Sequence, residues 1–184
     1  FKNMFHLIED QNDLKILDEE LIKLDFLAVD TEFYRKGKQD IKLSLIQVNN
    51  SEETFIIDCI KLGTYKDNCK FLFSEKVTKI FHSLREDLEA ILSWTKCKLV
   101  NVYDTQLANA FLGGSFSIGY QDLVKEKFEI LIDKDETRSN WTKRPLRDSQ
   151  LKYAANDVQF LIDLYIDQKE DLSRNGKIDW LYEE

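Results

Sequence analysis

Proline and glycine are scarce in this sequence, which contains one proline and six glycines among 184 residues. No flexible linker, low-complexity tract or repeat is visible, so a single globular domain is expected over residues 1–184. No run approaches the ~20 apolar residues that a membrane-spanning helix needs, and no signal peptide is visible. These absences argue against a membrane protein and favour the cytoplasm.

Cysteine is also rare, and its spacing is irregular. Cys59, Cys69 and Cys97 are odd in number and lie far apart, which fits neither a disulfide framework nor a zinc-binding pattern. We therefore expect three small buried thiols in a reducing compartment.

Positive charge is in deficit as well, with 26 lysines and arginines against 34 acidic residues and a formal net charge of -8. Proteins that bind phosphate backbones usually carry a basic excess, so this balance argues mildly against a nucleic-acid partner. The objection is weak for an enzyme that holds metal ions, because such an enzyme must supply carboxylates. What matters then is where the positive charge lies.

Apolar residues make up 43% of the chain, which is enough for a sizeable core, and their pattern predicts an α/β fold. Three closely spaced strands favour an antiparallel meander. Later strands alternate with helices, which suggests a mixed sheet with helices on both faces. On the first helix, one apolar face is expected to carry Leu84, Leu88, Ile91 and Leu92. The strands are expected at residues 26–33, 42–48, 54–60, 79–82 and 99–103, and the helices at 84–94, 105–112, 120–128 and 148–172.

Two acids end the first predicted strand, where Asp30 and Glu32 stand two residues apart. The strand period of two places both carboxylates on the same face. Two like charges on a buried strand are costly unless a cation neutralises them, which metal ions would do. If the strand ends before them instead, both side chains reach solvent and need no function.

Two predicted helices carry further polar candidates. Asp87 falls in a first turn, where it would also simply complement the helix dipole. Tyr153 and Asp157 are four residues apart and so share a helix face, although packing and solvation would explain them equally. Together the four acids could surround two divalent metal ions. Hard oxygen ligands without clustered cysteine or histidine favour Mg²⁺ or Mn²⁺.

Three short motifs resemble those of the DEDD exonuclease superfamily, in its tyrosine branch. They are Asp30-Thr-Glu32-Phe33, Phe81-His82-x4-Asp87-Leu88 and Tyr153-x3-Asp157. The string from Trp141 through Arg144-Pro145-Leu146 to Val158, with Ser44-Leu45-Ile46-Gln47-Val48, is similar to the ribonuclease D family. The histidine branch has a histidine five residues before its last aspartate, where this chain has Lys152. The resemblance runs from about residue 5 to residue 167.

This resemblance implies an RNase H-like fold and 3′→5′ hydrolysis of phosphodiester bonds, with release of nucleoside 5′-monophosphates. Asp30 would bridge two divalent ions, Mg²⁺ or Mn²⁺, and Glu32 and Asp157 would ligate the ion that activates water. Asp87 would help to hold the second ion through its water shell. Tyr153 would orient the attacking water, since a phenol with an ordinary pKa of about 10 is poorly suited as a base at neutral pH.

The expected partner is the single-stranded 3′ end of a nucleic acid, with RNA preferred over DNA and with structured RNA, including tRNA precursors, as substrate. Two alternatives stay open. One is the same chemistry on DNA, as in Werner-type or proofreading exonucleases, and the other is a non-catalytic module that only binds nucleic acid.

Residues 138–152 carry five basic residues and one acid, a surplus of four that would meet a phosphate backbone close to Tyr153. A solvated basic loop would have the same composition. The resemblance places this stretch beside the active site, but Arg144 is expected to be structural and not substrate-facing. The resemblance also implies an indirect supporting role for Asp104, and Gln47 is expected to hydrogen-bond within the sheet.

Several neighbours of the motifs are candidates for substrate contact. Phe33 is equally compatible with core packing, and for His82 a structural role beside Asp87 is the favoured alternative. The expected substrate-binding residues are Thr31, Phe33, His82, Lys143, Arg147 and Lys152.

Ribonuclease D proteins carry helical HRDC domains after the catalytic one, and this chain ends at Glu184. No HRDC domain is therefore expected within residues 1–184. Such accessory domains help to hold folded RNA, a role that homo-oligomerisation could fill here.

Overall fold

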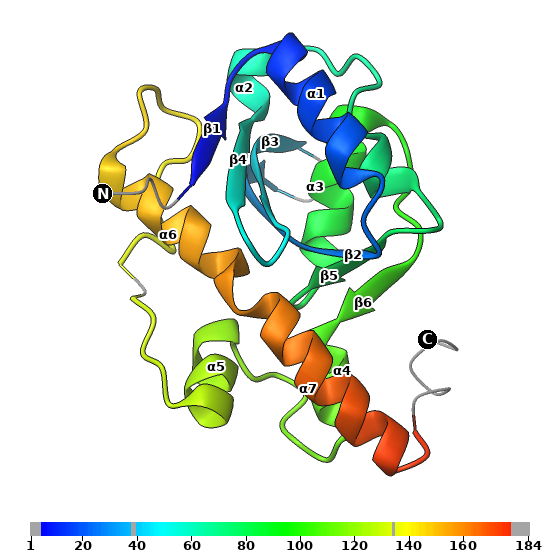
Figure 1. Ribbon diagram of the computed structural model, residues 1–184. Coiled ribbons are helices and arrows are strands. Elements are labelled where there is room, and N and C mark those ends of the chain that lie inside the picture. The colour runs from blue at the N-terminus through cyan, green and yellow to red at the C-terminus, as the bar shows by residue number, and fades with distance from the viewer. Residues whose placement is uncertain (1–4, 38–39, 134, 178–184) are drawn as a thin grey trace.

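A computed structural model describes residues 5–37, 40–133 and 135–177, which form an α/β structure around one six-stranded sheet (Figure 1). The strand order is β1-β4-β3-β2-β5-β6. The strands are β1 (His6–Ile8), β2 (Phe26–Lys36), β3 (Asp40–Asn49), β4 (Thr54–Asp58), β5 (Thr78–Phe81) and β6 (Val102–Asp104).

The sheet is mixed, as the sequence predicts. Strands β2, β3 and β4 form the antiparallel meander, and β5 and β6 continue from β2 in parallel. The first elements were not predicted: β1 adds a parallel strand beside β4, and α1 (Gln11–Leu21) follows it. The Asp10 carboxylate accepts hydrogen bonds from the backbone N–H groups of Asn12 and Asp13, which fixes the start of α1.

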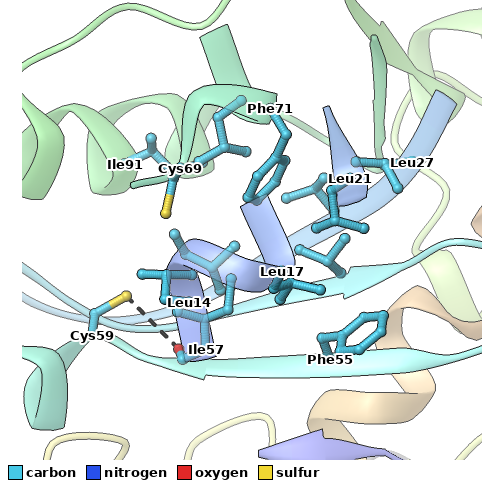
Figure 2. Close-up of a cluster of buried hydrophobic side chains, with 14 of the residues drawn as sticks. Leu14, Leu17, Leu21, Leu27, Phe55, Ile57, Cys59, Cys69, Phe71 and Ile91 are labelled. Carbon is cyan, nitrogen blue, oxygen red and sulfur yellow. Dashed lines mark hydrogen bonds between the residues drawn. The ribbon is translucent and has the colours of Figure 1, made fainter. Parts of the chain in front are cut away.

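The largest hydrophobic core lies on the face of the sheet next to α1 and α3 (Arg85–Thr95). Figure 2 shows leucines of α1 gathered with Leu27 and Ile57 of the sheet. Cys59 and Cys69 are free thiols buried in this core, whereas Cys97 is exposed, so the expectation of a buried thiol is wrong there. Two short helices, α2 (Cys59–Leu62) and the 3₁₀ helix η1 (Lys70–Phe73), close the same side.

The opposite face is covered by the C-terminal helices. The small side chains of Ala154 and Ala155 are buried and let α6 pack closely on β2, β3 and β4, while α7 packs on β2 and β5. The helices on this side are α4 (Thr105–Phe111), α5 (Tyr120–Phe128), α6 (Asp148–Gln159) and α7 (Leu161–Arg174). No helix in the described ranges is long and apolar enough to cross a membrane.

The predicted apolar face of α3 is partly wrong. Leu84 and Ile91 are buried, but Leu88 and Leu92 are 36% and 41% exposed. The side of α3 that meets the sheet carries Asp87, Ala90, Ile91 and Thr95. The helix is therefore rotated so that the acid, and not the leucines, turns inward.

The predicted helix 148–172 is two helices, α6 and α7, which meet at Phe160 (Figure 1). The Tyr120 hydroxyl donates to the Asn156 carbonyl at 3.0 Å and accepts from the Phe160 N–H at 3.0 Å. These two backbone groups are the donor and acceptor of one ordinary helical hydrogen bond, so the hydroxyl is inserted into the helix.

Several element boundaries also differ from the prediction. The third predicted strand ends at Asp58 and not at residue 60, because the Asp58 carboxylate caps α2 through the N–H groups of Ile60 and Lys61. The last strand covers residues 102–104 and not 99–103.

A buried ion pair joins the loop before α6 to the sheet. Arg144 Nε and Nη2 donate to the two carboxylate oxygens of Asp58 at 2.6 and 2.7 Å, and Asp58 is 1% exposed. Arg144 also donates to the Trp141 carbonyl at 2.7 Å. These contacts confirm the structural role expected for Arg144.

Arg144→Ala should destabilise the protein by about 3–5 kcal/mol, because it leaves the Asp58 carboxylate buried without a partner. Urea unfolding followed by circular dichroism measures this change. Arg174→Ala is the matched control, since its pairs with Glu170 and Asp171 are exposed, and it should change stability by less than about 0.5 kcal/mol. Equal effects in the two variants would contradict the role of the buried pair.

Candidate active site

Three carboxylates converge on the face of the sheet that α6 covers. Asp30 and Glu32 project from β2, and Asp157 comes from the last turn of α6. One ligand oxygen from each lies within 4.8 Å of the other two. The strand period of two therefore places the acid pair on one buried face, as the sequence predicts.

A β-bulge follows the acid pair. Glu32 pairs with Leu45, but Phe33 pairs with Leu43, so Ser44 is an extra residue on β3. Bulges bend a strand and re-aim its side chains. This bulge lies directly after Glu32, the last residue that β2 contributes to the carboxylate group.

Asp87, the fourth predicted acid, lies outside the group of three carboxylates. Asp87 lies on α3, and its Oδ1 atom accepts a hydrogen bond from the Thr31 hydroxyl of β2. Its negative charge still raises the pKa values of Asp30 and Glu32. Asp87 therefore stands beside the cluster rather than within it.

Asp104 supports the segment that carries Asp87, which agrees with its expected indirect role. Its carboxylate accepts from the backbone N–H groups of Ser83 at 3.0 Å and Leu84 at 2.9 Å, just before α3 begins. The same carboxylate caps α4 through the N–H of Gln106 at 2.8 Å. One side chain thus fixes the starts of two helices.

Burial is the main electrostatic influence on the four acids. It raises the pKa values of Asp30 and Glu32 well above their ordinary values, and repulsion among the neighbouring carboxylates raises them further. Burial likewise raises the pKa of Asp87 and that of Asp157 to about 7 each. Carboxylates in such a group ionise fully only beside cations, and their hard oxygen donors fit divalent ions such as Mg²⁺ or Mn²⁺.

Tyr153 lies beside this cluster, one helical turn before Asp157. Burial, followed by the nearby charge of Asp157, raises the pKa of Tyr153, so its hydroxyl stays protonated. The hydroxyl oxygen lies 3.2 Å from Thr137 Oγ1, and the ring packs against Trp141.

Gln121 is a neighbour of the site that the sequence motifs do not indicate. Its Nε2 donates to Asp157 Oδ1 at 3.4 Å, and this contact and a hydrogen bond from Tyr153 both lower the pKa of Asp157 against the effect of burial. Gln121 is next to Tyr120 in the sequence. The start of α5 therefore contacts both the Asp157 carboxylate and the junction between α6 and α7.

The predicted substrate residues from the first two motifs have protein contacts. Thr31 is buried on Asp87, and Phe33 is half-buried against the core, with the Arg35 guanidinium 5.8 Å from its ring centroid. Both ring nitrogens of His82 are engaged, Nδ1 with Thr105 Oγ1 at 2.9 Å and Nε2 with the Ile118 carbonyl at 2.8 Å. These contacts match the structural alternative for His82.

The basic candidates lie at or before α6. Lys143 is exposed, and Arg147 pairs with Glu136 at the start of the helix. Lys152 and Tyr153 line a hollow of about 210 Å³ that also contains Asp133, Asp135 and Glu136. Acids therefore surround part of the predicted basic surplus.

The hydrogen bond expected for Gln47 is absent among the described residues. Both polar atoms of its side-chain amide are buried without a partner, although Gln47 lies in the centre of β3. Covering both faces of the sheet leaves this polar residue 0% exposed.

The carboxylate group has the donors to hold divalent metal ions, and the comparison with known proteins shows the family. The pattern of the family described as 3′-5′ exonuclease matches residues 5–172. The match covers most of the chain, so the protein belongs to this family.

Ribonuclease D proteins are prominent among its relatives. Ribonuclease D of Pseudomonas paraeruginosa is 40% identical over 159 residues, which are 86% of this chain and 42% of that protein. Ribonuclease D of a Shewanella strain is 33% identical over 182 residues, 99% of this chain and 47% of that protein. The crystal structure of Escherichia coli RNase D, an exoribonuclease involved in structured RNA processing, matches with a TM-score of 0.89 and 30% identity, over 95% of this chain and 46% of that one.

These similarities confirm the predicted ribonuclease D-like membership and the RNase H-like α/β fold. The chain spans less than half of the length of these three relatives.

Without divalent ions the protein should lose stability as the pH rises. The folded state binds protons on Asp87 and Asp157 with pKa values of about 7, against 3.8 ordinarily. Their contribution is fully present below pH 3.8 and is lost as the pH rises through about 7. Urea unfolding in EDTA at several pH values between 5 and 8 measures the loss.

Mg²⁺ or Mn²⁺ should restore stability most at the alkaline end of this range, where the ions replace the missing protons. Asp157→Asn should flatten the pH dependence, since it removes one of the titrating groups. An unfolding midpoint that does not vary with pH in EDTA would contradict the electrostatic account.

Proposed function

We propose that the protein is a two-metal-ion 3′→5′ exoribonuclease that removes nucleoside 5′-monophosphates from the 3′ end of RNA. The observation that carries this proposal is the convergence of Asp30, Glu32 and Asp157 in a chain of the 3′-5′ exonuclease family. Three clustered carboxylates that are at least half-buried contribute little to stability without a cation, but they suit two Mg²⁺ or Mn²⁺ ions.

The acids divide the work of holding these ions. Asp30, Glu32 and Asp157 would hold the ions, because one ligand oxygen of each lies within 4.8 Å of the other two. Asp87, fixed by Thr31, would act at the edge of the site. When bound, the ions activate the attacking water and stabilise the leaving oxygen.

Tyr153 acts as a hydrogen-bonding group and not as a base in this proposal. Its raised pKa keeps the phenol protonated, so the hydroxyl orients the attacking water towards the terminal phosphorus. The water oxygen bonds to phosphorus and the bond from phosphorus to the 3′ oxygen of the preceding nucleotide breaks. The shortened chain keeps a 3′ hydroxyl, and the released nucleotide carries the phosphate.

RNA is the proposed substrate because the curated relatives are ribonuclease D proteins and the RNase D of Escherichia coli acts in structured RNA processing. Structured RNA 3′ ends, including those of tRNA precursors, are the proposed natural class. The cytoplasm is the proposed compartment, in keeping with the free thiols buried in the core. A homo-oligomer would extend the surface that holds the RNA, and light scattering of the purified protein measures this state.

Asp157→Asn should lower exonuclease activity by more than about 100-fold, because even outer partners of metal ligands change affinity or activity 10–100-fold. Its unfolding midpoint in EDTA at neutral pH should be unchanged or higher, since a buried repulsive charge is removed. Asp163→Asn, an exposed acid on α7, is the matched control and should keep full activity. Full activity of Asp157→Asn would refute the assignment of the site.

A 5′-labelled single-stranded RNA should give a ladder that shortens from the 3′ end with Mg²⁺ or Mn²⁺ and stops in EDTA. The parallel DNA oligonucleotide of the same sequence should be degraded more slowly. Faster cleavage of DNA would assign the chain to the DNA alternative, and cleavage from the 5′ end would reject the proposed polarity. Binding without any cleavage would favour the non-catalytic module.

A further inference from the structure

Gln47 is a buried polar residue that the proposed chemistry does not yet use. It is 0% exposed, and neither Nε2 nor Oε1 has a hydrogen-bond partner within the described parts of the chain. Burying an amide in this way costs stability, so a core position with no further role would favour an apolar side chain.

The position of Gln47 in the sheet connects it with the site. Strands β2 and β3 are antiparallel, and Gln47 is the direct partner of Asp30 in their register. Directly opposed residues point to the same face, with Cβ atoms roughly 4.5–5.5 Å apart. Gln47 therefore lies beside Asp30 on the face that α6 covers, within the reach of a side chain with three rotatable bonds.

A charged carboxylate that holds a cation needs its orientation fixed. Ligating carboxylates usually accept hydrogen bonds from neighbouring groups, and such bonds strengthen when the acceptor is ionised. Asp87 has Thr31 for this purpose, and Asp157 has Gln121. The Thr31 backbone N–H donates to Asp30, but no side chain among the described residues does. The Gln47 amide is an unused donor on the neighbouring strand, directly opposite Asp30.

We propose that Gln47 is a positioning residue for Asp30: its Nε2 group donates a hydrogen bond to the ionised Asp30 carboxylate and holds it in the orientation that binds divalent cations. This inference rests on the proposed function. It assigns Gln47 a role in cation binding that is distinct from support of the fold.

Gln168 provides a matched control, because it is equally buried but fully engaged in structure. Its Nε2 donates to the Thr105 carbonyl at 2.8 Å, and its Oε1 accepts from the Tyr103 hydroxyl at 3.4 Å. Replacing each glutamine by methionine removes the amide and keeps a flexible chain of similar length.

The experiment compares Gln47→Met and Gln168→Met in two measurements, urea unfolding in EDTA and Mn²⁺ affinity by isothermal titration calorimetry. Gln47→Met should weaken Mn²⁺ binding by about tenfold and leave the unfolding midpoint unchanged or higher. Gln168→Met should lower the midpoint and leave the Mn²⁺ affinity unchanged.

A lower midpoint with wild-type Mn²⁺ affinity for Gln47→Met would overturn the inference and make Gln47 a structural residue. If the wild-type protein binds no Mn²⁺, the proposed function fails and this inference fails with it. If Gln47→Met does not fold, nuclear magnetic resonance of the wild-type protein decides. Mg²⁺ should shift the side-chain amide signals of Gln47 and not those of Gln168, and unshifted Gln47 signals would overturn the proposal.

Discussion

Repulsion among buried carboxylates is the constraint on which this structure depends. Two acidic sites, one around Asp58 and one around Asp30, lie on the same face of the sheet, and only the first has a cationic side chain as its partner. Asp58 on β4 accepts hydrogen bonds from Nε and Nη2 of Arg144, whereas Asp30, Glu32 and Asp157 pair with no lysine or arginine in the described ranges. At Asp58, where the carboxylate has a structural role, the chain itself provides the positive charge through Arg144. Where the charge is left unpaired, the neutralising cation must come from outside, and that is the property a metal-dependent nuclease requires.

Two of the four acids are contacted by a side chain from another element, so the site depends on tertiary packing. Thr31 fixes Asp87, and Gln121 contacts Asp157. Tyr120, beside Gln121, inserts its hydroxyl between the Asn156 carbonyl and the Phe160 N–H, and α6 ends there, at Gln159. The start of α5 therefore sets both the length of α6 and the surroundings of its last carboxylate. The two effects are linked because they come from adjacent residues.

Local pattern was sufficient for the antiparallel meander and for the face that carries Asp30 and Glu32, because side chains alternate with a period of two in any strand. It did not reveal β1. Local pattern failed where a residue distant in the sequence determines where a helix ends or which face it buries. The break at Phe160 depends on a tyrosine 40 residues away and leaves no proline or glycine as a signal. The prediction for α3 placed Leu88 and Leu92 on the buried face, because leucines usually point inward, whereas the structure buries Asp87. The sequence did not reveal that Gln47 is fully buried, because this depends on helices that cover both faces of β3.

The same distinction applies to the basic stretch, whose composition alone suggested a binding surface. Arg144 turns inward to Asp58, Arg147 pairs with Glu136, and Lys152 shares its hollow with three acids. A count of charges along the sequence therefore overstates the positive potential that a phosphate backbone would meet. In a chain with a net charge of -8, the strongest attraction for a terminal phosphate must come from the divalent ions in the carboxylate group. Substrate binding and catalysis would then depend on the same buried acids.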